Sequence, residues 1–194
     1  AKVSLPGGCA IGTRPVDLHL FALKKMGAKI KIKDGYIIAD AKNGLKGNII
    51  KFPSISVGAT ENALLAAAKA EGTTVLKNCA IEPEVKDLIK FLKKLGLIIN
   101  LKGRNIIIKH RKIKNSQIVH NVIFDRIELG TYMIASALQV KNNITIDKID
   151  PKIIKSEIDI LKKIGVKIKK NKTSITIKKN KKLKNINIST KPYP

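Results

Sequence analysis

The sequence predicts a mixed α/β protein assembled from a repeated unit, and three observations support this fold class. First, three similar segments occur: "LKKMGAKIKIKDGYIIA" from Leu23, "LKKLGLIINLKGRNIII" from Leu92 and "LKKIGVKIKKNKTSITI" from Leu161. Second, each segment carries a glycine at a constant spacing of 69 residues, at Gly27, Gly96 and Gly165. Third, each segment passes from a helical to an alternating apolar pattern. Such regular self-similarity is typical of a repeated supersecondary unit.

An amphipathic helix is expected at the start of each unit. In the middle unit, apolar residues recur at intervals of three and four positions, at Val85, Leu88, Ile89, Leu92 and Leu95. Two positions of this face are apolar in all three units, namely Val16, Val85 and Ile154, and Leu20, Ile89 and Ile158. Lysines and then the glycine should end each helix, because cations suit its negative end and glycine adopts positive φ.

A β-hairpin is expected after each of these helices. The turn pairs Asp34–Gly35 and Lys102–Gly103 precede the second strands, residues 36–39 and 105–109. A further strand and a long second helix then complete the unit. In the middle unit, this second helix is "SVGATENALLAAAKAEG", for which Thr60 is the predicted N-cap, and "TTVLKNC" is the strand after it. The final "INISTKPYP" is also strand-like.

The charge balance indicates a strongly basic surface. The 194 residues include 39 Lys and Arg against 14 Asp and Glu, which gives a net charge of +25, and 44% of them are hydrophobic. Such an excess favours nucleic acid as a partner, because cations release phosphate counterions. However, only four of the basic residues are arginines, the type that base readers prefer. We therefore expect a generally basic surface and no specific nucleic acid; a nucleic-acid-binding module is the alternative.

Other features of the sequence limit the protein class. Cys9 and Cys79 form no CxxC pair and the three histidines are scattered, so we expect no disulfide framework, metal or other cofactor. No apolar run approaches the roughly 18–20 residues of a membrane span, and no signal peptide is recognisable. We expect a reduced, cytoplasmic setting and no membrane partner. The common nucleotide motifs GxGxxG and GK[ST] do not occur.

The stretch "PGGCAIGTRPVDLH" (residues 6–19) carries the strongest chemical signal. Glycines beside Cys9 let the backbone approach a ligand closely, and a nearby cation would favour the reactive thiolate. Arg14 suits a ligand phosphate or carboxylate, or alternatively an ion pair with Asp17. Pro15 and Asp17 suit the first turn of a helix, on which we expect His19 to be a solvated surface residue.

Two weaker features remain in the same part of the chain. "SVGAT" (residues 56–60) offers a glycine and hydroxyls at a helix N-terminus, where backbone amides bind phosphate. Ordinary helix capping is the alternative for this stretch. Cys79, at the end of a predicted strand, is expected to be a buried structural residue.

The loop "LPGGCAIGTRPVDLH" resembles the active-site loop of the UDP-N-acetylglucosamine enolpyruvyl transferase family. Further matches follow in the family's order: "GYIIADAKNGLKG", "SVGATENALLAAAKAEGTTVLKN", "EPEVKDLIKFLKKLG" and "DRIELGTYMIASA". Together they cover essentially the whole chain. The related shikimate-pathway enolpyruvyl transferases share the repeated fold but lack this loop.

This resemblance implies an activity and a set of site residues. The enolpyruvyl group of phosphoenolpyruvate would be transferred to the 3-hydroxyl of UDP-N-acetylglucosamine, for peptidoglycan synthesis. Cys9 would form an adduct with phosphoenolpyruvate and be the target of fosfomycin, and Arg14 would help hold the phosphate. The resemblance places Pro15, Val16, Asp17 and Leu18 at the uridine, and Ser56, Val57 and Gly58 at the diphosphate. Asp125 and Arg126, in "DRIELG", match a family string near the domain junction.

The resemblance also implies a two-domain enzyme, in which three α/β units form an inside-out barrel in each domain. Residues 1–120 would be two of the three units of the first domain, and residues 121–194 the first unit of the second. An aspartate general base would then follow just beyond Pro194, so that this chain would be a fragment, inactive alone. A remnant that only binds a UDP-sugar is the remaining alternative.

Overall fold

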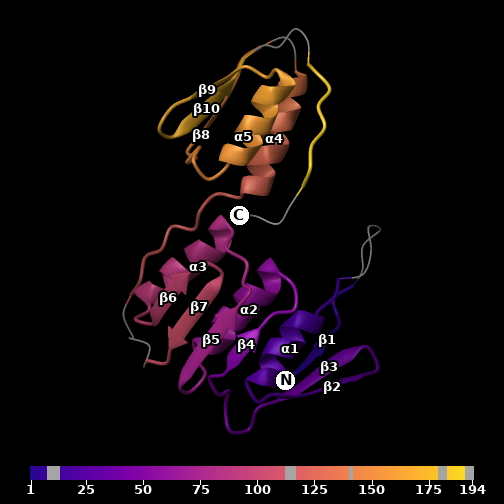
Figure 1. Ribbon diagram of the computed structural model, residues 1–194, viewed down its shortest axis with the longest axis vertical. Coiled ribbons are helices and arrows are strands. Elements are labelled where there is room, and N and C mark those ends of the chain that lie inside the picture. The colour runs from indigo at the N-terminus through magenta and orange to yellow at the C-terminus, as the bar shows by residue number, and fades with distance from the viewer. Residues whose placement is uncertain (8–13, 112–116, 140–141, 179–182, 191–194) are drawn as a thin grey trace. The chain divides into compact units, whose positions relative to one another are not determined.

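The computed structural model describes residues 1–7, 14–111, 117–139, 142–178 and 183–190, and Figure 1 labels its elements. The chain divides into two compact units, Ala1–Asn121 and Val122–Lys191. Both units combine helices with sheets, so the predicted mixed α/β class is confirmed.

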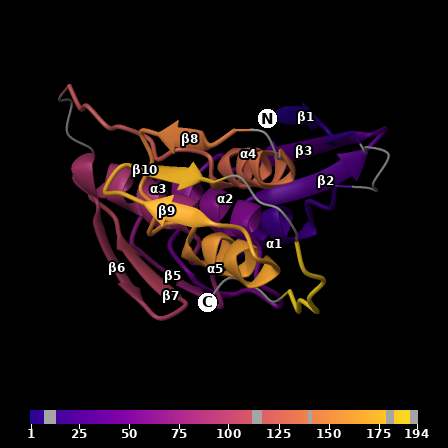
Figure 2. The same cartoon turned by 90° about the horizontal axis from the view of Figure 1, so that it is seen from above.

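Each of the three sequence repeats folds into the same arrangement of three strands and one helix. The elements are β1 (Lys2–Ser4), α1 (Asp17–Lys25), β2 (Lys29–Lys33) and β3 (Tyr36–Asp40); β5 (Thr73–Lys77), α3 (Pro83–Lys94), β6 (Ile98–Lys102) and β7 (Asn105–Lys109); and β8 (Ile144–Asp147), α5 (Lys155–Ile164), β9 (Ile168–Lys170) and β10 (Ser174–Ile177). The strands are antiparallel within each repeat, in the orders β1-β3-β2, β5-β7-β6 and β8-β10-β9. Figure 2 shows the first of these sheets, with β3 beside both β1 and β2. The sequence repeat is therefore also a structural repeat.

The predicted helix ends are confirmed. Two lysines lie in the last turn of α1, α3 and α5 alike. The glycine that follows has a φ of +97° at Gly27, +98° at Gly96 and +104° at Gly165. Residues with a side chain rarely adopt such angles, which explains why glycine recurs at this point of the repeat.

Short turns join the hairpin strands much as predicted. Asp34 and Gly35 both have positive φ, at 52° and 75°, as a two-residue hairpin turn matching the strand twist requires. The second turn is Gly103–Arg104 and not Lys102–Gly103, because β6 continues through Lys102. Glycine at the first position of this turn supplies its positive φ of 56°.

A strand and a second helix connect the first repeat to the next. Strand β4 (Ile49–Lys51) pairs in parallel with β5, which extends the sheet to the order β4-β5-β7-β6. Helix α2 (Val57–Ala67) follows β4, and α4 (Arg126–Leu138) occupies the same place 69 residues later. A strand is expected before α4, but residues 117–125, which the structure describes directly before this helix, form none. Instead, Val119 O accepts a hydrogen bond from Lys94 Nζ of α3 at 2.9 Å, so side chains of a helix hold this segment. Of the strand-like "INISTKPYP" (residues 186–194), residues 186–190 form no strand, and residues 191–194 lie outside the described residues.

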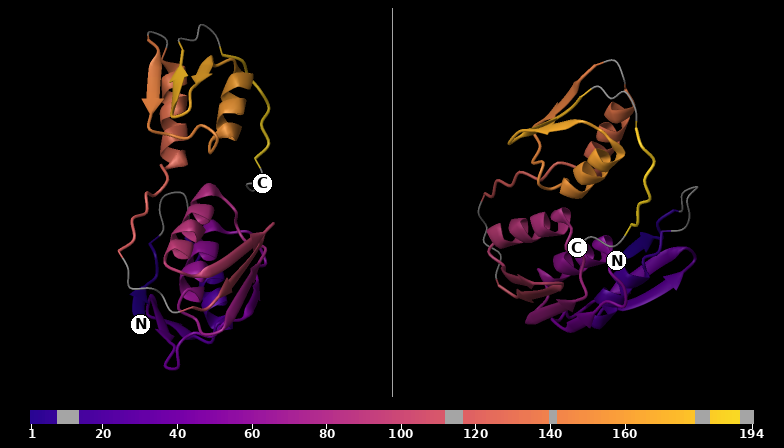
Figure 3. Two further views of the ribbon diagram at one scale, coloured as in Figure 1. Left: turned by 90° about the vertical axis from the view of Figure 1, so that its left-hand side faces the viewer. Right: turned by 45° about the horizontal axis from the view of Figure 1, so that its top comes forward.

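Helices cover one face of the four-stranded sheet, as Figure 3 shows. The core of this unit joins inward strand residues to helix residues that are at most 5% exposed, among them Ile50, Leu76, Ile106, Ile108, Ala63, Leu64, Val85, Ile89 and Leu92. Alternate strand residues such as Ile49 and Ile98 face outward. The second unit has its own core between α4, α5 and β10, formed by Leu129, Met133, Ile158, Leu161 and Ile175. In the first unit, this packing fixes the starts of the helices relative to the sheet.

Candidate functional site

The parallel strands β4 and β5 are followed by helices α2 and α3, so both helices start beyond neighbouring carboxyl ends. This edge of an α/β sheet commonly binds ligands, because helix N-termini present unpaired amides there. One of the two predicted binding segments, residues 56–58, lies at this edge.

The start of α2 leaves two backbone amides available. Ser56 is the N-cap, and its Oγ accepts a hydrogen bond from Ala59 N at 3.3 Å. The amides of Val57 and Gly58 come before the first intrahelical bond, and no group in the described part of the chain accepts from them. An anionic ligand could therefore bind these two amides without displacing a protein contact.

The prediction of Thr60 as N-cap is wrong, because α2 begins earlier. Thr60 lies inside the helix and is fully buried. Its hydroxyl donates to Ser56 O at 2.7 Å and accepts from Ala80 N at 3.0 Å. This threonine therefore ties the helix to the segment after β5 and caps nothing.

The start of α1 carries the second predicted segment. The helix begins at Asp17, with Val16 as an N-cap that makes no side-chain bond. Asp17 lies in the first turn as predicted, whereas Pro15 precedes the helix and is not part of that turn. Arg14 and Asp17 are exposed, and no ion pair joins them in the described structure. Leu18 packs against the core.

The structure brings the starts of α1 and α2 together. His19 Nε2 lies 3.1 Å from the position that a Cβ would occupy at Gly58. This contact joins Gly58, in the segment predicted at the diphosphate (56–58), to the residue that follows the segment predicted at the uridine (15–18). The expectation of a solvated His19 is wrong: the residue is partly buried, and its Nδ1 is buried without a hydrogen-bond partner among the described residues. The reason is that α1 packs on α2 along this side.

The two cysteines differ in what the structure says of them. Cys9 lies outside the described residues. Its segment follows β1, beyond which Leu5 N donates to Gly35 O at 2.8 Å, and precedes α1. Cys79 is fully buried, as predicted. Burial raises the pKa of its thiol to about 12, and a hydrogen bond with Thr60 only partly opposes this.

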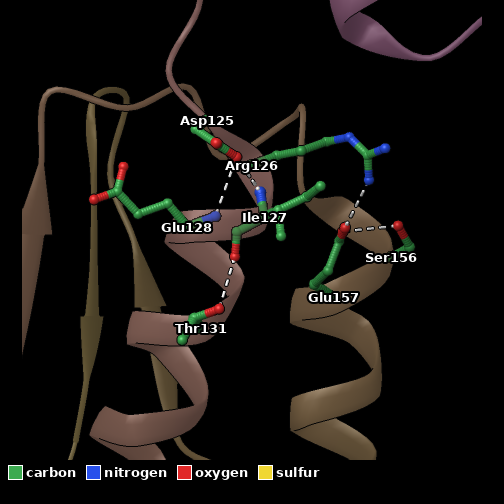
Figure 4. Close-up of polar contacts among 7 residues, drawn as sticks. All are labelled: Asp125, Arg126, Ile127, Glu128, Thr131, Ser156 and Glu157. Carbon is green, nitrogen blue, oxygen red and sulfur yellow. Dashed lines mark hydrogen bonds and ion pairs between the residues drawn. The ribbon is translucent and has the colours of Figure 1, made fainter. Parts of the chain in front are cut away.

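Asp125 and Arg126 make local contacts in the second unit, shown in Figure 4. Asp125 is the N-cap of α4, and its Oδ1 accepts from the amides of Ile127 and Glu128 at 2.8 and 3.1 Å. Arg126 Nη1 lies 3.7 Å from Glu157 Oε1 of α5. Ser56 and Asp125 are 69 residues apart and cap equivalent helices. At α4, however, the acidic cap already accepts from the amide of Ile127, which is the equivalent of Gly58.

Sequence reasoning missed two groups of ionisable residues. Glu82 is 7% exposed, and its Oε2 has no partner among the described residues. The pKa of nearby Glu61 is raised by burial first and then by the carboxylates of Glu84 and Glu82. Periodicity could not reveal this cluster, because it joins separate helices.

The second missed group is a histidine–carboxylate pair. His120 Nε2 lies 3.0 Å from Asp87 Oδ2, and both side chains are 10% exposed. The pair links α3 to a segment 33 positions along the chain. The sequence pattern did not indicate this pair, because Asp87 lies among other polar residues of a predicted helix.

The described residues contain neither a membrane-spanning helix nor a metal-binding cluster. None of the helices is long and apolar enough to cross a membrane. Nor do three or more His, Cys, Asp or Glu side chains in those ranges gather into a group that could hold a metal ion.

The chain is similar to known proteins along its entire length. The family model described as EPSP synthase (3-phosphoshikimate 1-carboxyvinyltransferase) matches residues 1–194. A UDP-N-acetylglucosamine 1-carboxyvinyltransferase from Pelagibacter ubique (strain HTCC1062) is 55% identical over 194 residues, which are 100% of this chain and 46% of that protein. The protein of the same name from Endomicrobium trichonymphae is 49% identical over 193 residues, again 46% of its length. The chain thus spans less than half the length of these relatives.

Solved structures show the same fold at lower identity. The enolpyruvyl transferase NikO from Streptomyces tendae superposes with a TM-score of 0.80 at 23% identity, over 93% of this chain and 43% of that one. An EPSP synthase from Acinetobacter baumannii gives a TM-score of 0.65 at 20% identity, over 91% of this chain and 42% of its own.

Proposed function

The chain belongs to the EPSP synthase family, and from this premise we propose that it supplies the cysteine segment and part of the nucleotide-sugar site of a UDP-N-acetylglucosamine enolpyruvyl transferase. The reaction would join the enolpyruvyl group of phosphoenolpyruvate to the 3-hydroxyl of the sugar and release phosphate. Its setting would be the cytoplasm, in the synthesis of peptidoglycan. The first compact unit would hold two repeats of one domain, and the second unit would begin the other domain.

The observation that carries the proposal is the contact between the starts of α1 and α2. A UDP-sugar presents a flat pyrimidine base and a diphosphate a few bonds away, so its site must hold both features side by side. Residues 15–18 would hold the uridine, and Ser56, Val57 and Gly58 the diphosphate. The amides of Val57 and Gly58, which have no acceptor among the residues that the structure describes, support the second role, because a helix N-terminus attracts anions.

The proposed roles of Cys9 and Arg14 agree with their surroundings in the sequence and structure. Arg14 is exposed at the end of the Cys9 segment, where a guanidinium can form charge-assisted hydrogen bonds to a phosphate. Cys9 would be the thiol that forms the adduct with phosphoenolpyruvate. Cys79 is not a candidate for this adduct, since a buried thiol with a raised pKa is rarely ionised. For Asp125 and Arg126, the cap and the ion pair favour a structural part in the second unit.

Calorimetric titration with UDP-N-acetylglucosamine tests this proposal against a nucleic-acid-binding module. We expect saturable binding that UDP competes for and that salt weakens only slightly, because a diphosphate contributes few charges. A nucleic-acid module would instead ignore the UDP-sugar and bind DNA or RNA with a steep salt dependence. Phosphate release from both substrates then separates an enzyme part from a binding remnant. We expect none from the 194 residues alone, and turnover only when they are extended to the relatives' length.

A further inference from the structure

We propose that His19 is a positioning residue that couples the uridine side of the site to the start of α2. This inference rests on the proposed function, because it concerns a side chain between two segments that would bind one ligand. His19 lies on α1 directly after residues 15–18, and its imidazole reaches the first turn of α2 at Gly58. In this arrangement, the His19 imidazole sets the distance between residues 15–18 and the start of α2.

The contact depends on the absence of a side chain at Gly58. A Cβ there would lie 3.1 Å from His19 Nε2 and 3.6 Å from Cε1, and the first distance is closer than an ordinary van der Waals contact. The backbone at Gly58 does not have the positive φ that glycine is often needed for. Space for the imidazole is therefore the reason for glycine at this position, and it lets α1 approach the start of α2.

Within the described part of the chain, packing and not hydrogen bonding holds the imidazole in place. His19 Nδ1 is buried and has no partner among the described residues. Asn62 lies one turn after Gly58 on the same side of α2, and its Oδ1 is likewise buried and without a partner in the described structure. Buried polar atoms without partners destabilise a fold, and their occurrence in a native structure calls for an explanation. The buried nitrogen therefore lowers stability, and we infer that a role of the imidazole at the ligand site offsets this cost.

Loss of the imidazole should affect only ligands that engage both segments. A ligand bound by both segments gains affinity when their spacing is already correct, whereas a ligand bound by one segment does not. For the 194-residue chain, we expect His19→Ala to weaken UDP binding about tenfold and uridine or pyrophosphate binding less than about twofold, a contrast that pre-organisation produces. His19→Gln retains an amide that reaches toward Gly58 and should recover most of the affinity for UDP. His110→Ala, at the exposed residue after β7, is the matched control and should leave all three affinities unchanged.

A double-mutant cycle tests the contact without any ligand. Gly58→Ala should lower Tm in the wild type, because its new Cβ meets the imidazole. In the His19→Ala background, where that space is open, the same substitution should lower Tm much less. In the His110→Ala background, it should lower Tm as much as in the wild type. The cycle uses midpoints of thermal unfolding only, so it decides whether the coupling exists even if every variant binds weakly.

Several results would overturn the proposal. Additive changes in Tm would show that His19 and Gly58 are not coupled. UDP affinity unchanged in a folded His19→Ala chain would show that the coupling does not serve the site. An equal loss for pyrophosphate alone would assign the imidazole a direct phosphate contact in place of positioning. No UDP binding by the wild type would refute the proposed function itself, and the role of His19 with it; a non-additive cycle would then identify the contact as purely structural.

Discussion

Alkylation of the two thiols is a quantitative prediction of this structure. At pH 8, a cysteine with an ordinary pKa of about 8.5 is roughly one quarter thiolate. Cys79, with its pKa raised to about 12, is ionised to the order of one part in ten thousand at the same pH. Because the thiolate is the nucleophile, iodoacetamide should modify Cys9, if its pKa is ordinary, on the order of a thousand times faster than Cys79. The complete burial of Cys79 slows its reaction further.

Peptide mapping by mass spectrometry over a time course measures both rates in one sample. Labelling in urea is the control, since both thiols should then react at similar rates. A Cys9→Ser chain should remain almost unlabelled while folded. Equal labelling of the two cysteines in the folded chain would refute the reasoning, because it would mean that Cys79 is neither buried nor protonated as the structure requires.

Three further predictions concern stability and binding. Thr60→Val removes the buried acceptor of Ala80 N, so urea unfolding should show a loss of about 1–3 kcal/mol, against less than about 0.5 kcal/mol for the exposed Thr131→Val; equal losses would contradict the buried role. Because burial and neighbouring carboxylates raise the pKa of Glu61, its ionisation costs stability as pH rises through that pKa. Glu61→Gln should therefore raise Tm at neutral pH but not in acid, and a gain independent of pH would disprove this. Arg14→Ala, in an enzyme of the relatives' length, should weaken phosphoenolpyruvate binding by about 1.5–3 kcal/mol, the range for hydrogen bonds to charged groups; calorimetry that finds no change would return Arg14 to an ordinary surface role.

The repeated unit could be predicted from the sequence because its signals are local. The spacing of Gly27, Gly96 and Gly165 marks helix ends that require positive φ, and this requirement depends only on neighbouring backbone. The alternation from Lys29 to Asp40 likewise predicts a hairpin around Asp34–Gly35, which the structure contains. The strand order within each repeat was not predictable, since it depends on pairing between β1 and β3 across an intervening helix.

Features that depend on contacts between elements were predicted less well. Thr60 is a residue type that suits an N-cap, but Ser56 precedes it and caps the helix. The hydroxyl of Thr60 instead accepts a hydrogen bond from Ala80 N. His19 faces away from the apolar side of α1, and only the approach of α2 buries it. The strand expected before α4 follows from repeat symmetry alone. Here Lys94 Nζ instead donates a hydrogen bond to Val119 O, and this contact between a side chain and the backbone joins the segment to α3.

The most direct test of the central claim is to map UDP-N-acetylglucosamine on the chain by amide chemical shifts. We expect titration to move the amide signals of Val57 and Gly58 at the start of α2, together with those of Asp17 and Leu18 at the start of α1. Unlabelled UDP should produce the same pattern, and His19 should shift with both segments. Shifts confined to the lysine-rich surface of the second unit, or no shifts at either helix start at saturating ligand, would contradict the claim that these two segments form one nucleotide-sugar site.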